Sequence, residues 1–150
     1  MIRKLREDEK DEILSLWLKN ISLAHHFVDK SYWDEQLSHM QEDYLPHCEI
    51  VVATRDGKIV GFVMIEKDGS IIAVVVEEAY RRQGIGTELI RWAKNNYIHL
   101  AMSVYAKNRF ASYFCSTNDF EYRYEQYDVN TGEIEQFFEW RKNQSNGKLQ

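Results

Sequence analysis

The residues Val74-Val-Val-Glu-Glu-Ala-Tyr-Arg-Arg-Gln-Gly-Ile-Gly-Thr87 join an apolar strand to a helix, and they decide the fold. The unbroken apolar run that enters them, Ile71–Val76, is typical of a central strand covered on both faces. Beyond them, apolar residues recur at helical spacing over 89–97. Gly84 and Gly86 allow a tight turn in which several backbone N–H groups point toward one place. Followed by a helix N-terminus, such a turn is suited to a phosphate or pyrophosphate.

This loop lacks the longer patterns of two common nucleotide sites. It contains no six-residue Gly-x-Gly-x-x-Gly fingerprint, and no Gly-Lys-Ser/Thr follows it, which excludes a Rossmann or P-loop interpretation. The structural alternative, a tight strand-to-helix turn that binds nothing, stays open on the loop alone.

The other elements follow from hydrophobic periodicity and turn residues. One helix is expected to begin with Asp8 as its N-cap, and a second to cover 30–44 and stop before Pro46. Strands are expected over 2–6, 49–54, 59–65, 70–76, 98–105, 120–128 and 133–140, and a short helix over 108–117. Gly61 falls inside a strand, which indicates a bulge or a close backbone approach.

This order of elements predicts an α/β fold. The sheet is expected to be mixed, mostly antiparallel, with helices on both of its faces. A chain of 150 residues suffices for one domain that needs no disulfide or metal to fold. We expect this single domain to span 1–142, and the polar tail 143–150 to be frayed.

The charge of the chain is unevenly distributed. The net charge is −5, yet residues 81–109 contain six basic side chains (Arg81, Arg82, Arg91, Lys94, Lys107 and Arg109) and one acidic side chain. This basic island favours a compact anionic ligand, although ordinary surface charges would give the same pattern. The net negative charge argues against a general nucleic-acid binder.

Composition also indicates the compartment. The charged start of the chain does not fit a secretory signal, and the run Ile71–Val76 is too short for a membrane helix. Two cysteines form no disulfide framework, and His47 with Cys48 supplies too few ligands for zinc. We therefore expect a cytoplasmic protein with no metal and no membrane partner.

The quoted stretch resembles motif A of the GNAT superfamily of N-acetyltransferases, whose Arg/Gln-x-x-Gly-x-Gly/Ala signature is met by Arg81, Gly84 and Gly86. The spacing of the family's motif B is matched by Val104, Asn108, Ala111, Phe114 and Phe120. The order of elements is similar to the family over nearly the whole chain. The first helical region is similar to small bacterial members that are regarded as protein-lysine acetyltransferases.

The resemblance implies acetyl-CoA as the cofactor. Its pyrophosphate is expected on the loop and its pantetheine arm beside the preceding strand, in a V-shaped splay between two central parallel strands. A backbone N–H of that strand would serve as an oxyanion hole, and Asn108 would contact the pantetheine. The expected cofactor-binding residues are Val74, Val75, Val76, Arg81, Arg82, Gln83, Gly84, Ile85, Gly86, Thr87 and Asn108.

The candidate catalytic residues are Cys115 and His25. Cys115 stands where the resemblance places a tyrosine that protonates the leaving thiolate. It could be a proton donor, an acyl-accepting nucleophile without an evident base, or a small residue with no chemical role. Tyr113 points to another helix face and is no direct replacement. His25, or its neighbour His26, lies in the region that shapes the family's acceptor site and could act as a base, or it could simply cap or pack.

The expected activity is acetyl transfer directly to an amine, either a protein lysine or a small polyamine-like molecule. The acidic remainder of the chain favours a cationic acceptor. One alternative is a CoA-binding module or sensor that has lost efficient transfer, as Cys115 would allow. Another is an interaction domain whose loop binds nothing. Either a monomer or a homodimer is expected, and no patch in the sequence selects between them.

Overall fold

The strands of this chain form two sheets, one of four strands and one of three. The computed structural model describes residues 1–142, so the predicted tail, 143–150, lies outside the described residues. Each sheet belongs to a compact unit. Unit 1 comprises Met1–Lys67 with Ile71–Trp92, and unit 2 comprises Asp68–Ser70 with the chain from Ala93 onward. The single domain expected over 1–142 stays a prediction.

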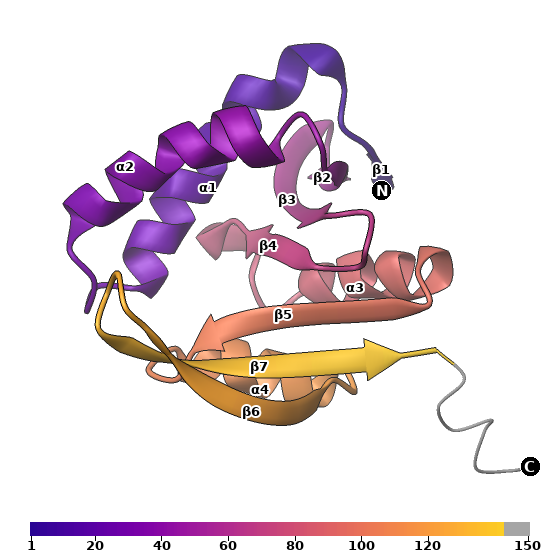
Figure 1. Cartoon of the computed structure of the whole chain (residues 1–150). Coiled ribbons are helices and arrows are strands. Elements are labelled where there is room, and N and C mark those ends of the chain that lie inside the picture. Colours follow the sequence, from indigo (N-terminus) through magenta and orange to yellow (C-terminus); the bar gives the residue numbers. More distant parts are fainter. Residues whose placement is uncertain (143–150) are drawn as a thin grey trace, which may run out of the picture. The chain divides into compact units, whose positions relative to one another are not determined.

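Unit 1 contains the four-stranded sheet, with strand order β1-β2-β3-β4 and antiparallel neighbours throughout (Figure 1). Its strands are β1 (Ile2–Lys4), β2 (Glu49–Arg55), β3 (Lys58–Ile65) and β4 (Ile71–Val76). The hairpin turn between β2 and β3 places Asp56 at φ 54° and Gly57 at φ 76°. Two residues with positive φ match the right-handed twist of the flanking strands, which is why Asp-Gly predicts a hairpin at this point.

The most deeply buried strand of this sheet is β3 and not β4. Every residue of β3 after Lys58 is buried, whereas 72–74 in β4 are half-buried. β4 is the last strand in the order of its sheet, so the expectation of a central strand is wrong for this sheet. An apolar run indicates that both faces of a strand are covered. It does not indicate where the strand lies in the hydrogen-bonded order of the sheet.

Gly61 of β3 has the close neighbour that its position in a strand predicts. A Cβ atom on Gly61 would lie 2.7 Å from the carbonyl oxygen of Val75 and 3.3 Å from Ile85 Cγ2. A β-bulge between Ala53 and Thr54 lies opposite it. Both predicted reasons for the glycine, a bulge and a close approach, are confirmed.

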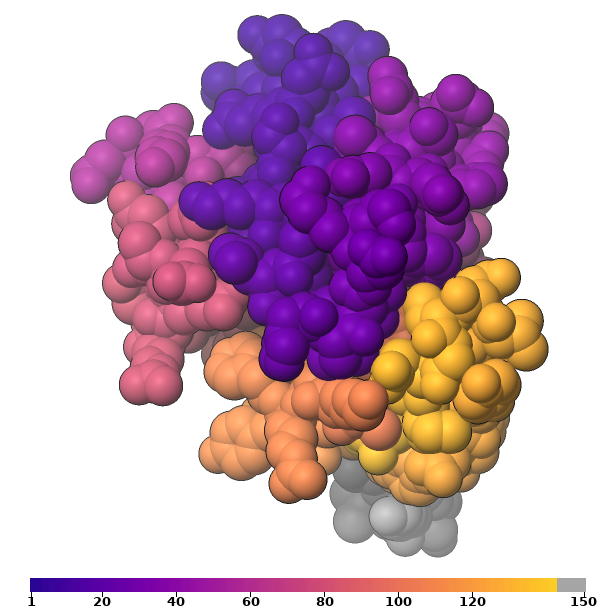
Figure 2. Space-filling model, turned by 90° about the vertical axis from the view of Figure 1, so that its left-hand side faces the viewer, coloured from indigo at the N-terminus to yellow at the C-terminus, as the bar shows by residue number. Residues whose placement is uncertain are grey.

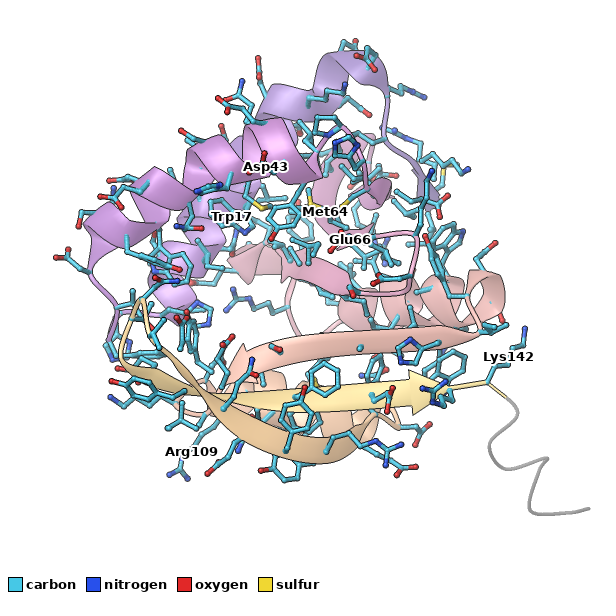
Figure 3. The ribbon with its side chains drawn as sticks, in the orientation of Figure 1. Trp17, Asp43, Met64, Glu66, Arg109 and Lys142 are labelled. Carbon is cyan, nitrogen blue, oxygen red and sulfur yellow. The ribbon has the colours of Figure 1, made fainter. Side chains whose placement is uncertain are left out.

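Two helices of unit 1, α1 (Lys10–Ala24) and α2 (Lys30–His39), pack side by side (Figure 1). Trp17 of α1 meets Trp33 of α2 edge to face, with ring centroids 6.4 Å apart. Trp17 and Met64 of β3, both labelled in Figure 3, are buried core residues of this unit. Trp17 therefore lies on the buried face of α1.

The ends of these helices differ from the sequence-based expectation. A 3-10 turn over Glu7–Glu9 precedes α1, and Glu9 binds Arg3 at 2.8 Å and the Arg6 N–H at 2.8 Å. The N-cap position of α1 is occupied by Glu9 and not by the predicted Asp8, and the Glu9 side chain makes no cap hydrogen bond to α1. At the other end, α2 stops at His39 and continues as a π-helical turn over Met40–Tyr44.

Unit 2 contains the three-stranded sheet with order β5-β7-β6, all antiparallel. Its elements are β5 (His99–Tyr105), α4 (Arg109–Thr117), β6 (Glu121–Asp128) and β7 (Glu133–Arg141). The figure shows α4 against one face of this sheet, and α4 contacts both β5 and β6 (Figure 1). The junction to α4 is short, as the spacing of the predicted strand and helix requires.

A short segment from earlier in the chain, Asp68–Ser70, completes unit 2. Ser70 forms an isolated parallel bridge with Ala101, and the Ala101 N–H donates to the Gly69 carbonyl at 3.0 Å. Gly69 has φ 94°, and a Cβ atom there would collide with the carbonyl oxygen of His99. Only glycine fits this approach of backbone to backbone.

Candidate functional site

The candidate site begins at the end of β4. Residues Val74–Val76 pair with Gly61–Val63 on one side only, because β4 is the last strand in the order of its sheet. The other edge of β4 carries N–H and C=O groups that no strand of that sheet uses. An extended ligand can hydrogen-bond to such an edge as an added strand.

The loop after β4 turns into helix α3 (Ile85–Asn96) with a backbone that favours glycine. Arg82 has φ 64° and Gly84 has φ 79°, and nothing lies within 4 Å of a Cβ atom built on Gly84. The Glu88 N–H donates to the Gly84 carbonyl at 2.9 Å. The N–H groups of 85–87 precede this bond and have no partner in the helical ladder. The loop therefore offers backbone N–H donors that lie outside the helical ladder, together with the positive end of the α3 helix dipole.

The electrostatics at the start of α3 also suit an anion. Glu88 lies in the first turn, where its carboxylate would repel a phosphate. Arg55 of β2 forms an ion pair with it, Arg55 Nη2 to Glu88 Oε1 at 2.9 Å. This contact neutralises the only acidic side chain of the first turn.

Arg81, expected among the cofactor-binding residues, makes its hydrogen bonds inside unit 1. Its Nε donates to the Val76 carbonyl at 3.2 Å, and its Nη2 donates to Asn20 Oδ1 at 3.1 Å. Asn20 is buried on α1 and donates through Nδ2 to the Leu16 carbonyl at 2.9 Å. The side chain thus joins the end of β4 to α1, which is a positioning role.

The basic island of the sequence divides into two groups in the structure. Lys94 donates to the Asn118 carbonyl at 2.5 Å, and Lys107 pairs with Glu133 at 3.2 Å, both within unit 2. Together with Arg81, half of the island is therefore committed to protein partners. The side chains of Arg82, Arg91 and Arg109 are exposed, and Figure 3 shows Arg109 extending away from α4. The charge count overstated the cations available to a ligand.

Asn108, in unit 2, caps helix α4. Its Oδ1 accepts a hydrogen bond from the Ala111 N–H at 3.1 Å, which satisfies one of the open donors of the first turn. The Asn108 N–H donates to the Tyr105 carbonyl at 2.9 Å. Its predicted contact with pantetheine stays a prediction.

The site thus consists of an edge strand followed by a glycine loop whose N–H groups lie outside the helical ladder. Comparison of the chain with known proteins shows where the same sequence pattern occurs. The family model described as Acetyltransferase (GNAT) family matches residues 11–115. The chain belongs to this family. It is accordingly a GNAT N-acetyltransferase, an enzyme whose cosubstrate is acetyl-CoA.

Individual relatives agree with this membership. Peptidyl-lysine N-acetyltransferase YiaC of Escherichia coli K12 is 32% identical over 120 residues, which cover 80% of this chain and 82% of YiaC. The solution structure of apo YjaB from Escherichia coli has a TM-score of 0.79 at 21% identity, over 93% of this chain and 96% of YjaB. A Bacillus anthracis protein named for streptothricin acetyltransferase, solved with acetyl coenzyme A, has a TM-score of 0.58 at 21% identity over 64% of each chain. The structural likeness confirms the predicted mixed α/β fold.

Cys115 has the surroundings of a packing residue. Its side chain lies on α4 and is fully buried, and burial raises the pKa of the thiol to about 12. A thiol with this pKa is neither a ready nucleophile nor a proton donor matched to a leaving thiolate. Of the three interpretations, these properties favour the small residue without a chemical role.

His25 is likewise built into the core of unit 1. It is 9% exposed, and its ring packs against Phe27 and Trp33, with centroid separations of 5.6 Å and 5.5 Å. Its Nδ1 lies 3.0 Å from the Ile21 carbonyl. A carbonyl only accepts, so Nδ1 carries the proton. Burial lowers the pKa of this histidine, which keeps the imidazole neutral near pH 7.

The sequence did not reveal the partners of the loop, namely Asn20 and Arg55. Asn20 offered one signal, since it continues the buried stripe of α1 where an apolar residue is expected. Among residues 1–142, no group of three or more His, Cys, Asp or Glu side chains could hold a metal ion. No helix in the same range has the length and apolar character to cross a membrane.

Proposed function

We propose that this enzyme transfers the acetyl group of acetyl-CoA to the side-chain amine of protein lysines. The observation that carries the donor half is the loop before α3, with Gly84 open on its Cβ side and the N–H groups of 85–87 outside the helical ladder. The acceptor half is supported by the names of YiaC and YjaB, which are both peptidyl-lysine N-acetyltransferases.

Different residues of unit 1 would bind different parts of acetyl-CoA. The backbone of Arg82–Thr87 would hold the pyrophosphate of acetyl-CoA, since its N–H groups and the α3 dipole both favour negative charge. The open edge of β4 at Val74–Val76 would hold the pantetheine arm as an added strand. A backbone N–H of the same strand would donate to the acetyl oxygen as negative charge develops on it.

Acetyl transfer also needs a neutral amine and a protonated leaving thiol. A lysine amine has an ordinary pKa near 10.4, so at neutral pH a base or water must take its proton before it attacks. His25 and Cys115 are buried, and this proposal does not use either as the proton carrier. Solvent water serves both steps, at a cost of about 10²- to 10⁴-fold in rate relative to a placed general acid or base.

We place this activity in the cytoplasm. Neither Cys48 nor Cys115 forms a disulfide, which fits a reducing compartment.

The experiment titrates the purified chain with acetyl-CoA and with CoA by calorimetry, then incubates it with acetyl-CoA and lysine-containing proteins. Micromolar binding and a mass increase of one acetyl group on lysine ε-amines are expected. Binding without acetylation of any protein would remove the acceptor half. Absence of binding would remove both halves.

A second candidate function is a CoA-binding module with weak transfer. The burial of Cys115 favours it. The family resemblance places a tyrosine at this position, and the buried thiol that replaces it is not placed to protonate a leaving thiolate. The two functions separate in one assay. Both bind acetyl-CoA, and only the enzyme consumes it when an amine is added.

A further inference from the structure

One lysine of helix α1 lies beside the end of the strand that is proposed to bind acetyl-CoA. Lys19 Nζ forms an ion pair with Glu77 Oε1 at 3.0 Å. Glu77 directly follows Val74–Val76 of β4 in the chain, and its N–H donates to the Val60 carbonyl at 2.8 Å. The Lys19 amine is therefore held next to the end of β4, within unit 1.

The next residue of α1, Asn20, is tied to the same end of β4. Its Oδ1 accepts a hydrogen bond from Arg81 Nη2 at 3.1 Å, and Arg81 Nε donates to the Val76 carbonyl at 3.2 Å. Asn20 is buried, whereas the Lys19 side chain is 60% exposed. Figure 2 shows α1, in indigo, at the surface beside the pink segment that follows β4. Asn20 thus anchors the helix, and Lys19 places an accessible amine at the same point.

The other lysines of α1 and α2 have local partners. Lys10 pairs with Glu7, three residues earlier in the chain, at 2.9 Å. Lys30 pairs with Asp34, four residues later, at 3.3 Å. Lys19 instead pairs with a residue 58 positions later, just after β4. In these two helices, whose residues are all described, Lys19 is the lysine that lies at the candidate site.

The ion pair with Glu77 keeps the amine near the strand without fixing it there. Solvent screens an exposed pair, and holding two long side chains in one geometry costs entropy, so such pairs contribute little and open readily. Val75 lies two residues before Glu77, which corresponds to about 7 Å along an extended chain. Rotation about the flexible four-carbon stem of Lys19 moves its amine over distances of this size. The amine can therefore leave Glu77 for the part of β4 that would hold the acetyl group.

We propose that this enzyme acetylates its own Lys19 from acetyl-CoA bound to the same molecule. The inference rests on the proposed function, since it uses the same donor site and the same kind of acceptor. The Lys19 ammonium first gives one proton to water, and its nitrogen lone pair then attacks the acetyl carbonyl carbon to form a C–N bond. The C–S bond breaks, and its electron pair leaves on the CoA sulfur, which is protonated by water as the nitrogen loses its second proton. The product is an uncharged amide that cannot keep the ion pair with Glu77.

The test incubates the full chain with deuterium-labelled acetyl-CoA and no other acceptor, and locates the label by peptide mass spectrometry. Lys19 should be labelled with a first-order rate constant that is independent of protein concentration, because donor and acceptor belong to one molecule. Lys19→Arg keeps a cation opposite Glu77 but removes the amine, so the fast labelling should disappear. Lys30→Arg is the matched control, since Lys30 is also an exposed, ion-paired helix lysine of unit 1, and it should leave the labelling of Lys19 unchanged.

Reaction of lysines with acetyl-CoA in solution is separated by a variant of the donor site. In the wild type, Lys19 should be labelled about tenfold faster than Lys30 or more, because its amine is held near the bound donor. In Gly84→Asp, whose added carboxylate repels the pyrophosphate of acetyl-CoA, the two lysines should be labelled at similar rates. Equal rates in the wild type would overturn the proposal, and so would a Lys19 rate constant that rises with protein concentration.

Addition of lysine-containing proteins separates this inference from the proposed function. Label on those proteins without label on Lys19 would overturn the inference and leave the proposed function standing. Binding of acetyl-CoA without label on either would overturn both. Label on Lys19 and on the added proteins would support both.

Discussion

Helices α3 and α4 each follow a strand, yet they begin in opposite ways. At α3 the entry residue is Gly84, which has no side chain to accept a hydrogen bond, and the first-turn N–H groups are left open. At α4 the entry residue is Asn108, whose Oδ1 accepts from the Ala111 N–H at 3.1 Å. Every helix must deal with its first four N–H groups. This chain caps one first-turn N–H group of α4 with its own Asn108 side chain, and at Gly84 it has no side chain that could do the same for α3.

The difference separates two residues that motif matching had grouped together. Both Gly84 and Asn108 were expected to bind the cofactor. The structure gives the Asn108 side chain a role in stability that is independent of any ligand, whereas Gly84 contributes only its positive φ. Substitutions at the two helix starts should therefore affect stability and acetyl-CoA binding in different proportions.

The largest expected effect follows from placing a carboxylate at the open helix start. Gly84→Asp should weaken acetyl-CoA binding on the order of 100-fold, because it repels the pyrophosphate and displaces charge-assisted hydrogen bonds worth about 1.5–3 kcal/mol each. Aspartate tolerates positive φ, and Asp56 and Asp119 already have φ 54° and 67° in this chain. Calorimetric titration measures the change.

Gly57→Asp is the matched control for this change. Gly57 has φ 76° and open space around its Cβ position, as Gly84 does, but it lies in the β2–β3 hairpin. Backbone strain and added charge are the same, so acetyl-CoA affinity should not change. Equal losses in both variants would mean that the loop before α3 is not the binding site.

Removing the contact that anchors the loop should mainly change stability. Arg81→Ala leaves the buried Asn20 Oδ1 without its donor, and we expect the free energy of unfolding to fall by about 1–3 kcal/mol. Denaturant unfolding measures this. Arg82→Ala removes an exposed side chain and should change stability by less than about 0.5 kcal/mol.

The binding data should show the reverse order. Arg82→Ala should weaken acetyl-CoA binding several-fold, while folded Arg81→Ala keeps affinity close to that of the wild type. If Arg81→Ala lost affinity and kept full stability, the positioning role assigned to Arg81 would be wrong.

Two substitutions of Asn108 distinguish its capping of α4 from its predicted contact with pantetheine. Asn108→Ala removes the cap of α4 and should cost about 1 kcal/mol of unfolding free energy. Asn108→Asp keeps an oxygen at the same place and should retain the stability, but it removes the amide donor. Lower acetyl-CoA affinity in Asn108→Asp would support the predicted pantetheine contact, whereas unchanged affinity would limit Asn108 to capping.

A smaller effect is expected in the pH dependence of stability. The pKa of His25 is lowered in the folded state from an ordinary value of 6.5, so the unfolded chain binds the proton more readily. The contribution of His25 is therefore complete above about pH 6.5 and decreases as the pH falls below it. His25→Gln should flatten the loss of stability below about pH 6.5. His26→Gln, at the exposed neighbouring position, is the matched control variant.

The smallest effect is expected for Cys115→Ala. Since Cys115 is fully buried and its pKa is raised to about 12, its loss should change the acetylation rate by less than about twofold. A catalytic acid would cost about 10²- to 10⁴-fold, and a decrease of that size would restore the chemical role. Cys115→Tyr should overpack α4 and lower the unfolding free energy by about 1–3 kcal/mol.

Local features of the fold were predictable, because their causes lie within a few residues. Asp56-Gly57 required a hairpin turn, and Gly61 required a close backbone neighbour, and both are observed. The π-helical turn after α2 was not predictable. It forms when the Leu45 N–H donates to the Met40 carbonyl at 2.8 Å instead of one residue nearer, which periodicity does not encode.

The part of the candidate site that is formed by backbone groups was predictable from the sequence. The contacts between side chains that support it were not. Gly84 and Gly86 identify the loop through their conformational freedom, which is a property of the residue itself. The role of Arg81 depends on Asn20, which lies 61 positions earlier in the chain. Motif spacing predicted that Arg81 contacts the ligand. A single sequence does not show which distant residues pair, so the contact with Asn20 could not be predicted.

The segment Asp68–Ser70 limits how this protein can be dissected. It belongs to unit 2 although the chain enters it from β3 and leaves it into β4, both of which belong to unit 1. A fragment that begins at Ala93 would lack the Gly69 carbonyl that accepts the Ala101 N–H. Split-reporter or domain-swap designs that cut the chain once, before unit 2, would therefore give a fragment whose first strand has lost this bridge.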